Sequence, residues 1–143
     1  MKNLKFIAAA FFALFLSSAW AFDPTEMTEQ DANCLTRAIY HEARGEGEKG
    51  MFAVAAVVVN RARHYNFASD ICSVVHQRGQ FTFDKKARMS ESSSVWKTQR
   101  VVEVVRSGFM PLYDFLYFHR TDVIGQCTNK KRKMKIGSHY FCE

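Results

Sequence analysis

Nine apolar residues follow one another without interruption from Met51 to Val59. A helix that is apolar on every side does not lie at the surface of a globular domain, so the rest of the chain has to pack around it. A buried strand is the competing interpretation of a valine-rich run, but the alanines and the continuation into the Asn60–Arg63 segment favour a helix. We therefore expect a central helix in a single hydrophobic core, which is also what 143 residues predict.

The first 21 residues have the organisation of a secretory signal peptide. Lys2 and Lys5 precede eleven apolar residues, Phe6–Leu16, and Ser17–Ala21 ends in an Ala-x-Ala cleavage site. Eleven residues do not cross a bilayer as a helix, so we expect no permanent membrane span; an uncleaved, temporary anchor is the alternative. Cleavage after Ala21 leaves residues 22–143 as one domain and removes two lysines and no acid, which lowers the net charge from +6 to +4.

Four cysteines lie beyond the cleavage site, and an exported chain normally oxidises an even number of cysteines in pairs. Three pairings are possible. We favour Cys34 with Cys72 and Cys127 with Cys142, because the second pair closes a short basic C-terminal segment. No CxxC spacing indicates a metal site, and we expect neither a metal nor another cofactor.

The chain is predicted to have an α+β fold that is predominantly helical, with a small β element. Besides the central helix, the helical ranges are about Glu29–Arg44, with Thr28 and Asp31 as a capping box, Asp70–Gln77, and a helix that starts near Ser90–Ser94 and ends before Gly108. The predicted strands are Gln80–Phe83, Leu112–His119 and a C-terminal hairpin whose turn holds the basic run Lys130–Lys133.

One carboxylate falls on the apolar face of the first helix. Leu35, Ala38 and Ile39 define that face, and helical spacing extends it to Glu42. Burial raises the pKa of a glutamic acid, and an acid that is protonated near neutral pH can donate a proton to a glycosidic oxygen. The alternative is a structural ion pair of Glu42 with Arg37, Arg44 or Arg61.

Other catalytic patterns fail. His41–Glu42 begins an HExxH zinc motif, but position 45 is glycine, and there is no G-x-S-x-G elbow. Glu46 lies four residues after Glu42, beyond Gly45. It is either an arginine partner in the loop or a second carboxylate that positions water or sugar.

Several blocks of the sequence together resemble the SleB-type cell-wall hydrolases, the spore cortex-lytic enzyme family. The blocks lie in family order from about Asp31 onward, and E-A-R-G-E, residues 42–46, is the most specific of them. The others are Ala53–Arg61, Cys72–Gln77, Gly79–Phe83 and Ile136–Phe141. This resemblance implies a compact, lysozyme-like domain that cleaves peptidoglycan between N-acetylmuramic acid and N-acetylglucosamine as a lytic transglycosylase, with Glu42 as its catalytic acid.

A lytic transglycosylase can use a single carboxylic acid, which protonates the leaving oxygen and then accepts the proton of the muramyl C6 hydroxyl as a 1,6-anhydro ring closes. The alternatives are a hydrolytic muramidase, an N-acetylmuramoyl-L-alanine amidase, or a non-catalytic peptidoglycan-binding protein. Sugar recognition requires hydrogen-bonding and aromatic side chains, for which the candidates are Gln80, Thr82, Tyr117, His119 and Glu46. Tyr117 and His119 are equally compatible with the solvent face of a strand.

The expected partner is the peptidoglycan glycan strand, contacted by a monomer that is exported to the periplasm or secreted. Nucleic acid is not expected, because the basic residues 130–135 contain no interleaved aromatic residues and the chain is exported.

Overall fold

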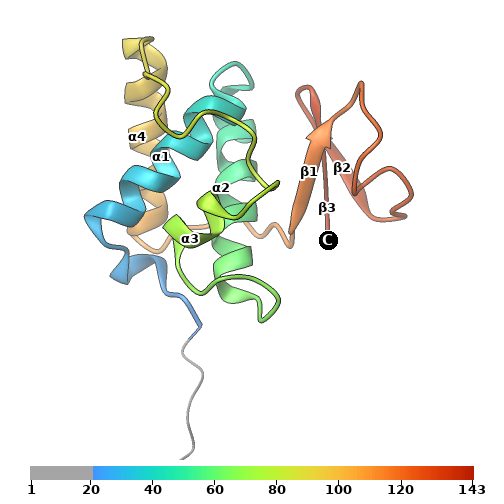
Figure 1. Cartoon of the computed structure of the whole chain (residues 1–143), viewed down its shortest axis with the longest axis horizontal. Coiled ribbons are helices and arrows are strands. Elements are labelled where there is room, and N and C mark those ends of the chain that lie inside the picture. The colour runs from blue at the N-terminus through green and yellow to red at the C-terminus, as the bar shows by residue number, and fades with distance from the viewer. Residues whose placement is uncertain (1–20) are drawn as a thin grey trace, which may run out of the picture.

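The computed structural model describes residues 21–143, so the predicted signal peptide lies outside the described residues except for Ala21 (Figure 1). A short 3-10 helix precedes four α-helices and three strands. Their bounds are η1 Pro24–Glu26, α1 Glu29–Ala43, α2 Gly47–Arg63, α3 Ile71–His76, α4 Ser92–Arg106, β1 Tyr117–Arg120, β2 Lys133–Ile136 and β3 His139–Cys142.

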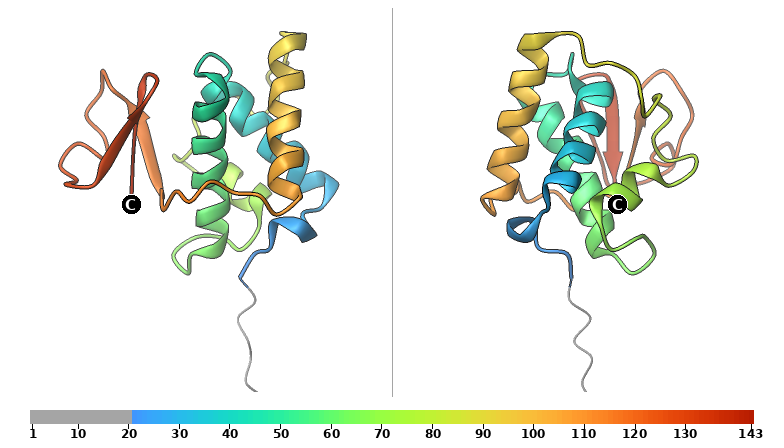
Figure 2. Two further views of the ribbon diagram at one scale, coloured as in Figure 1. Left: turned by 180° about the vertical axis from the view of Figure 1, so that it is seen from behind. Right: turned by 60° about the vertical axis from the view of Figure 1, so that its left-hand side comes forward.

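Helix α2 is the centre of the molecule, as the apolar run predicts. It contacts α1, α3 and α4 on one side and β1 and β2 on the other, so that it stands between the sheet and α4 (Figure 2). Residues 53–59 are completely buried. The core therefore extends from the helices through α2 to the inner face of the sheet, where Phe141 and Ile136 are buried.

The start of α1 is fixed by local hydrogen bonds. The Thr28 hydroxyl accepts a hydrogen bond from the Asp31 amide at 3.1 Å and donates one to the Asp31 carboxylate at 2.7 Å. The other Asp31 oxygen accepts from the amide of Cys72 in α3 at 3.2 Å. Beside this contact the Cys34–Cys72 disulfide joins α1 to α3, which confirms the first of the two pairings.

The sheet is antiparallel, with strand order β1-β3-β2. Cys142, at the end of the central strand, pairs with Tyr117 of β1 and with Lys133 of β2. Its side chain forms a disulfide with Cys127, in the segment between β1 and β2, so the second pairing is also confirmed.

The predicted strand at Gln80–Phe83 is wrong. These residues belong to an irregular segment between α3 and α4, here called the 77–91 loop, which runs across α1 (Figure 1). Their alternation reflects side-chain packing, because the Phe81 ring lies 6.1 Å from Phe118 and the Phe83 ring 4.8 Å from His41.

The predicted strand at Leu112–His119 is too long at its start. Strand β1 begins only at Tyr117, because side chains of α2 bind the backbone before it. Asn60 donates to the carbonyls of Tyr113 at 2.6 Å and Phe115 at 3.0 Å, and Arg61 Nε donates to the carbonyl of Leu116 at 2.7 Å. Because these carbonyls accept hydrogen bonds from α2, they are not available to a partner strand.

The C-terminal hairpin exists, but its turn is not basic. Gly137 and Ser138 form the turn, where Gly137 has a φ of 56°, a conformation that favours glycine. The basic residues 130–132 precede β2, whereas Lys133 and Lys135 lie within it.

Among the described residues, no helix has the length and apolarity needed to span a membrane.

Candidate active site

Glu42 lies in the last turn of α1, where Ala38 and Ile39 one turn earlier are fully buried. Its own side chain is half-buried. Burial raises the pKa of the Glu42 carboxyl above its ordinary value of 4.5, and the positive charge of Lys85 opposes that effect only in part. The structure therefore holds a carboxyl group that retains its proton to higher pH than an exposed glutamate.

The three arginines that were candidates for an ion pair with Glu42 are engaged elsewhere. Arg37 donates to the carbonyl of Ala87 at 2.6 Å, and Arg44 pairs with Glu91 at 3.1 Å. Arg61 binds the backbone before β1. Within residues 21–143, Glu42 takes part in no ion pair of 4.0 Å or less. The structural ion pair considered as an alternative is therefore not formed.

The 77–91 loop is fastened to one face of α1. Arg37, Tyr40 and Arg44 are spaced at i, i+3 and i+7 on this face, and all three bind the second half of the loop. The buried Tyr40 hydroxyl accepts hydrogen bonds from the amides of Ser90 and Glu91, each at 3.1 Å. The loop is consequently held beside the end of α1 where Glu42 lies.

An aromatic and cationic stack connects the loop to the residue before Glu42. The ring of His41 is stacked on Phe83, with centroids 4.8 Å apart, and Lys85 Nζ lies 3.9 Å from the Phe83 centroid. Burial, followed by the charges of Arg37 and Arg44, lowers the pKa of His41. A neutral imidazole is thus favoured next to the candidate acid.

Gln80 and Thr82 lie in the first half of this loop, on either side of the buried Phe81. Gln80 is partly exposed, and its backbone N–H donates to the backbone carbonyl of Gln77 at 3.3 Å. Thr82 is exposed. The loop that holds these two candidates thus also carries Lys85, whose charge acts on Glu42.

Tyr117 and His119 make different contacts. The Tyr117 ring packs against Arg61, whose guanidinium carbon lies 5.6 Å from the ring centroid. His119 Nδ1 is 2.7 Å from the Arg120 carbonyl, and the ring packs against Gly125, where an added Cβ would lie within 2.8 Å of three ring and side-chain atoms. Neither residue has a contact with Glu42 among those described.

Arg61 is only 3% exposed, and within residues 21–143 no carboxylate lies within 4.0 Å of its guanidinium. The rings of Phe67, Phe81 and Tyr117 surround its guanidinium at 5.1 to 5.6 Å. Burial lowers the pKa of Arg61 to about 10. The cation–π contacts and the hydrogen bond to Leu116 offset part of this desolvation, although Nη1 has no hydrogen-bond partner within the described residues. These contacts attach β1 to α2.

Glu46 connects α2 to the hairpin. It is the residue that precedes α2, and its carboxylate accepts hydrogen bonds from the Ser138 amide at 2.7 Å and from the Ser138 hydroxyl. His139 Nδ1 lies 3.6 Å away. Burial raises the pKa of Glu46, but the two hydrogen bonds from Ser138, together with the charges of His139 and Arg120, outweigh burial and leave the pKa lowered. With 17% side-chain exposure and these partners, Glu46 serves the hairpin rather than an arginine in the loop.

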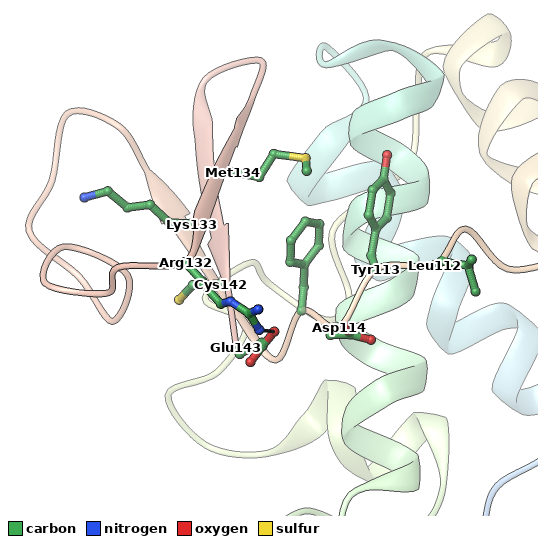
Figure 3. Close-up of a pocket in the computed structure, with 9 residues that line it drawn as sticks. Leu112, Tyr113, Asp114, Arg132, Lys133, Met134, Cys142 and Glu143 are labelled. Carbon is green, nitrogen blue, oxygen red and sulfur yellow. Dashed lines mark ion pairs between the residues drawn. The ribbon is translucent and has the colours of Figure 1, made fainter.

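A separate hollow of about 250 Å³ lies between the α4–β1 connection and the sheet (Figure 3). Tyr113, stacked on Phe115 at 4.8 Å, forms one wall, and Met134 of β2 another. Arg132 and Glu143 face one another at 3.7 Å at its edge. Its lining does not include Glu42.

Among residues 21–143, no group of three or more His, Cys, Asp and Glu side chains is arranged to hold a metal ion.

Residues 45–142 match the sequence model of the Cell Wall Hydrolase family, and the chain belongs to this family. The resemblance to the SleB-type cell-wall hydrolases is thereby confirmed. The chain is 27% identical over 122 residues to the spore cortex-lytic enzyme of Bacillus subtilis (strain 168), a comparison that covers 84% of this chain and 40% of the relative. For the spore cortex-lytic enzyme of Bacillus cereus the identity is 26% over 122 residues, with 84% and 47% covered. The chain thus spans less than half the length of these relatives.

Two solved structures have the same fold. The catalytic domain of the germination-specific lytic transglycosylase SleB from Bacillus anthracis superimposes with a TM-score of 0.69 at 26% identity, covering 82% of this chain and 98% of that domain. The catalytic domain of the Bacillus cereus SleB protein gives a TM-score of 0.67 at 25% identity, covering 85% and 95%. The expected α+β fold, mainly helical with a small sheet, is therefore confirmed.

Three residues beside Glu42 were not predicted from the sequence. They are Tyr40 and His41, which contact the 77–91 loop, and Lys85, which the loop brings in. Tyr40 has a detectable signal, because it lies at i+3 from Arg37 and i−4 from Arg44 on one helical face. No sequence pattern indicates Lys85, because its position depends on the path of an irregular loop.

Proposed function

We propose that this protein cleaves the glycan strand of peptidoglycan as a lytic transglycosylase, with Glu42 as both acid and base. The observation that supports this most directly is the half-buried Glu42 carboxyl, whose pKa burial raises and which has no ion-pair partner among the described residues. Membership of the Cell Wall Hydrolase family and similarity to a lytic transglycosylase catalytic domain support the same reaction. The family match begins beyond Glu42, so the case for this residue depends on its placement.

The reaction needs only one carboxyl group. Protonated Glu42 donates its proton to the oxygen that links N-acetylmuramic acid to N-acetylglucosamine, and the bond from the muramyl C1 to this oxygen breaks. The resulting carboxylate then accepts the proton of the muramyl C6 hydroxyl while the C6 oxygen bonds to C1. The products are a 1,6-anhydromuramyl end and a new N-acetylglucosamine end, and Glu42 is protonated again.

Gln80 and Thr82 are proposed to contact the sugar, because the 77–91 loop places them on the same segment as Lys85. Glu46, Tyr117 and His119 remain candidates by sequence. Their contacts with Ser138, Arg61 and Gly125 give each of them a structural role that needs no substrate. The substrate lies in the cell wall, which agrees with the predicted signal peptide and with action in the periplasm or outside the cell.

Mass spectrometry of the fragments released from purified peptidoglycan by the exported, oxidised protein tests this function. The wild type is expected to release 1,6-anhydromuropeptides, and Glu42→Gln should reduce the release at least about 100-fold, the lower range for a lost general acid. Glu48→Gln is the matched control, since Glu48 is exposed in the first turn of α2.

Each alternative activity has a different product. Reducing muramic acid ends would identify a muramidase, and free stem peptides would identify an amidase. If neither wild type nor Glu42→Gln released any fragment while both bound peptidoglycan equally, the protein would be a non-catalytic binding protein.

A further inference from the structure

Lys85 is held in place by two groups of its own loop. Its Nζ donates a hydrogen bond to the Phe81 carbonyl at 2.6 Å and lies 3.9 Å from the centroid of the Phe83 ring. The Phe83 ring is in turn stacked on His41, the neighbour of Glu42 in α1. A lysine restrained by a carbonyl and an aromatic face loses much of its rotational freedom, and its ammonium has further N–H groups with which to donate.

The other charged groups around this end of α1 are already engaged. Arg37 binds the Ala87 carbonyl, and Arg44 pairs with Glu91. Asp84 accepts from the amide of Lys86 and acts on His41 rather than on Glu42. Lys85, by contrast, takes part in no ion pair of 4.0 Å or less within the described residues, and the Phe83–His41 stack holds it at this end of α1. Its charge lowers the pKa of Glu42.

We propose that Lys85 is a positioning residue that stabilises the carboxylate formed when Glu42 gives its proton to the glycosidic oxygen. This inference rests on the proposed function of Glu42. In the first step the O–H bond of Glu42 breaks and its electron pair stays on the carboxylate, which lies in a partly desolvated site. A fixed ammonium compensates this new charge without gaining or losing a proton itself.

The sign of the effect follows from the geometry. The Lys85 charge lowers the pKa of Glu42 and so opposes burial, which makes Glu42 a stronger acid while leaving it protonated above its ordinary range. Removal of the charge raises the pKa of Glu42 further. The acid then donates its proton less readily, and the activity that depends on the protonated form persists to higher pH.

Two neutral variants and two controls test this role. Lys85→Gln and Lys85→Met remove the charge, Lys85→Arg retains it, and Lys86→Gln removes the charge of the exposed neighbouring lysine. Two quantities are measured for each protein: the titration of the Glu42 carboxyl by 13C NMR, and the pH profile of kcat on purified peptidoglycan. Near-UV circular dichroism identifies any variant that does not fold.

In the neutral variants, the pKa of Glu42 should rise by roughly one unit, the low end of the effect of a nearby opposite charge. The pH at which kcat declines on the alkaline side should move upward by the same amount. The maximal kcat should fall by up to about tenfold, because one pKa unit corresponds to a factor of ten and the proton is only partly transferred in the transition state. Lys85→Arg and Lys86→Gln should leave both pH values unchanged.

An unchanged Glu42 titration in a folded neutral variant would overturn the proposal. A lower kcat without a displaced alkaline limb would also overturn it, because a merely structural lysine gives that result. The NMR titration requires no activity, so it still decides the role of Lys85 if the wild type fails to release anhydromuropeptides and the proposed function is wrong.

Discussion

Two glutamates four residues apart have opposite protonation properties. Glu42 is half-buried without an ion-pair partner within the described chain, and burial raises its pKa. Glu46 is also mostly buried, but two hydrogen bonds from Ser138 lower its pKa. The environment of each carboxyl, rather than its residue type, therefore separates the proposed proton donor, Glu42, from an acceptor that holds the hairpin, Glu46.

The raised pKa of Glu42 implies that its negative charge destabilises the folded protein. Between the ordinary pKa of 4.5 and the raised folded value, the folded state binds more protons than the unfolded state, so stability falls as pH rises. Glu42→Gln is expected to have a higher Tm than wild type at neutral pH and an equal Tm below pH 4. Thermal denaturation at both pH values measures this, and an equal Tm at neutral pH would contradict it.

Glu46→Gln should have the opposite effect. A carboxyl with a lowered folded pKa contributes stability above its ordinary value of 4.5, and that contribution is lost as pH falls through the folded pKa. The loss of charge-assisted hydrogen bonds to Ser138 should lower the free energy of unfolding by about 1–2 kcal/mol at neutral pH. Urea denaturation of this variant and of Glu48→Gln, its exposed control, gives the difference. Equal stability of the two would show that the contact with Ser138 contributes nothing.

At the scale of elements, the 77–91 loop depends on α1 for its position. Arg37, Tyr40 and Arg44 of α1 bind its second half, and Phe83 is stacked on His41. Outside α1, the buried Phe81 packs against Phe118 and Arg61. The loop contains no helix or strand. Loss of one of these α1 side-chain contacts should therefore reduce the local stability of the loop more than the stability of the core.

Tyr40→Phe tests this dependence, because it removes one oxygen and keeps the buried ring. The Ser90 and Glu91 amides lose their acceptor, which should lower the free energy of unfolding by about 1 kcal/mol and speed amide exchange in residues 84–91. Hydrogen–deuterium exchange with mass spectrometry measures the local effect. Tyr65→Phe is the control, since Tyr65 is 90% exposed. Exchange that is unchanged in the loop would mean that other contacts suffice to hold it.

The elements with helical periodicity were predictable from the sequence, and the sheet was predictable only in outline. The run at Met51–Val59 and the face of Leu35, Ala38 and Ile39 correctly predicted α2 and α1, and Glu42 on that face is half-buried. Alternation at Gln80–Phe83 failed as a strand signal, because the two phenylalanines alternate to reach His41 and Phe118 rather than a partner strand.

The remaining part of the site depends on long-range contacts that no local pattern encodes. The charge of Lys85 acts on Glu42 from a loop that Arg37, Tyr40 and Arg44 help to position. Likewise, Glu46 binds Ser138, which is 92 positions away in the chain. Both glutamates were singled out from the sequence, whereas their partners required the structure.

At the scale of the whole molecule, the two disulfides stabilise different regions. Cys34–Cys72 closes a loop of 38 residues in the helical part, and Cys127–Cys142 closes one of 15 residues in the sheet. Chain entropy predicts a larger contribution from the longer loop, about 4 kcal/mol against about 3 kcal/mol.

Replacing each cysteine pair by alanine should therefore destabilise the protein in both cases, and more strongly for Cys34 and Cys72. Denaturation by guanidinium chloride under oxidising conditions measures the two losses. The same proteins under reducing conditions serve as the control, since wild type and both variants should then converge. A greater loss for the Cys127 and Cys142 pair would show that strain or residual structure outweighs loop length.

The strand order β1-β3-β2 determines when the sheet can form during synthesis. The middle strand, β3, follows every other described element in the chain, so β1 and β2 have no neighbour to pair with until it arrives. The helices and their disulfide can assemble from residues made earlier, while the sheet and the Ser138 contact with Glu46 wait for residues 138–142. During synthesis, therefore, β3 is the last of the described elements to be made, and its arrival completes both the sheet and the contact between Glu46 and the hairpin.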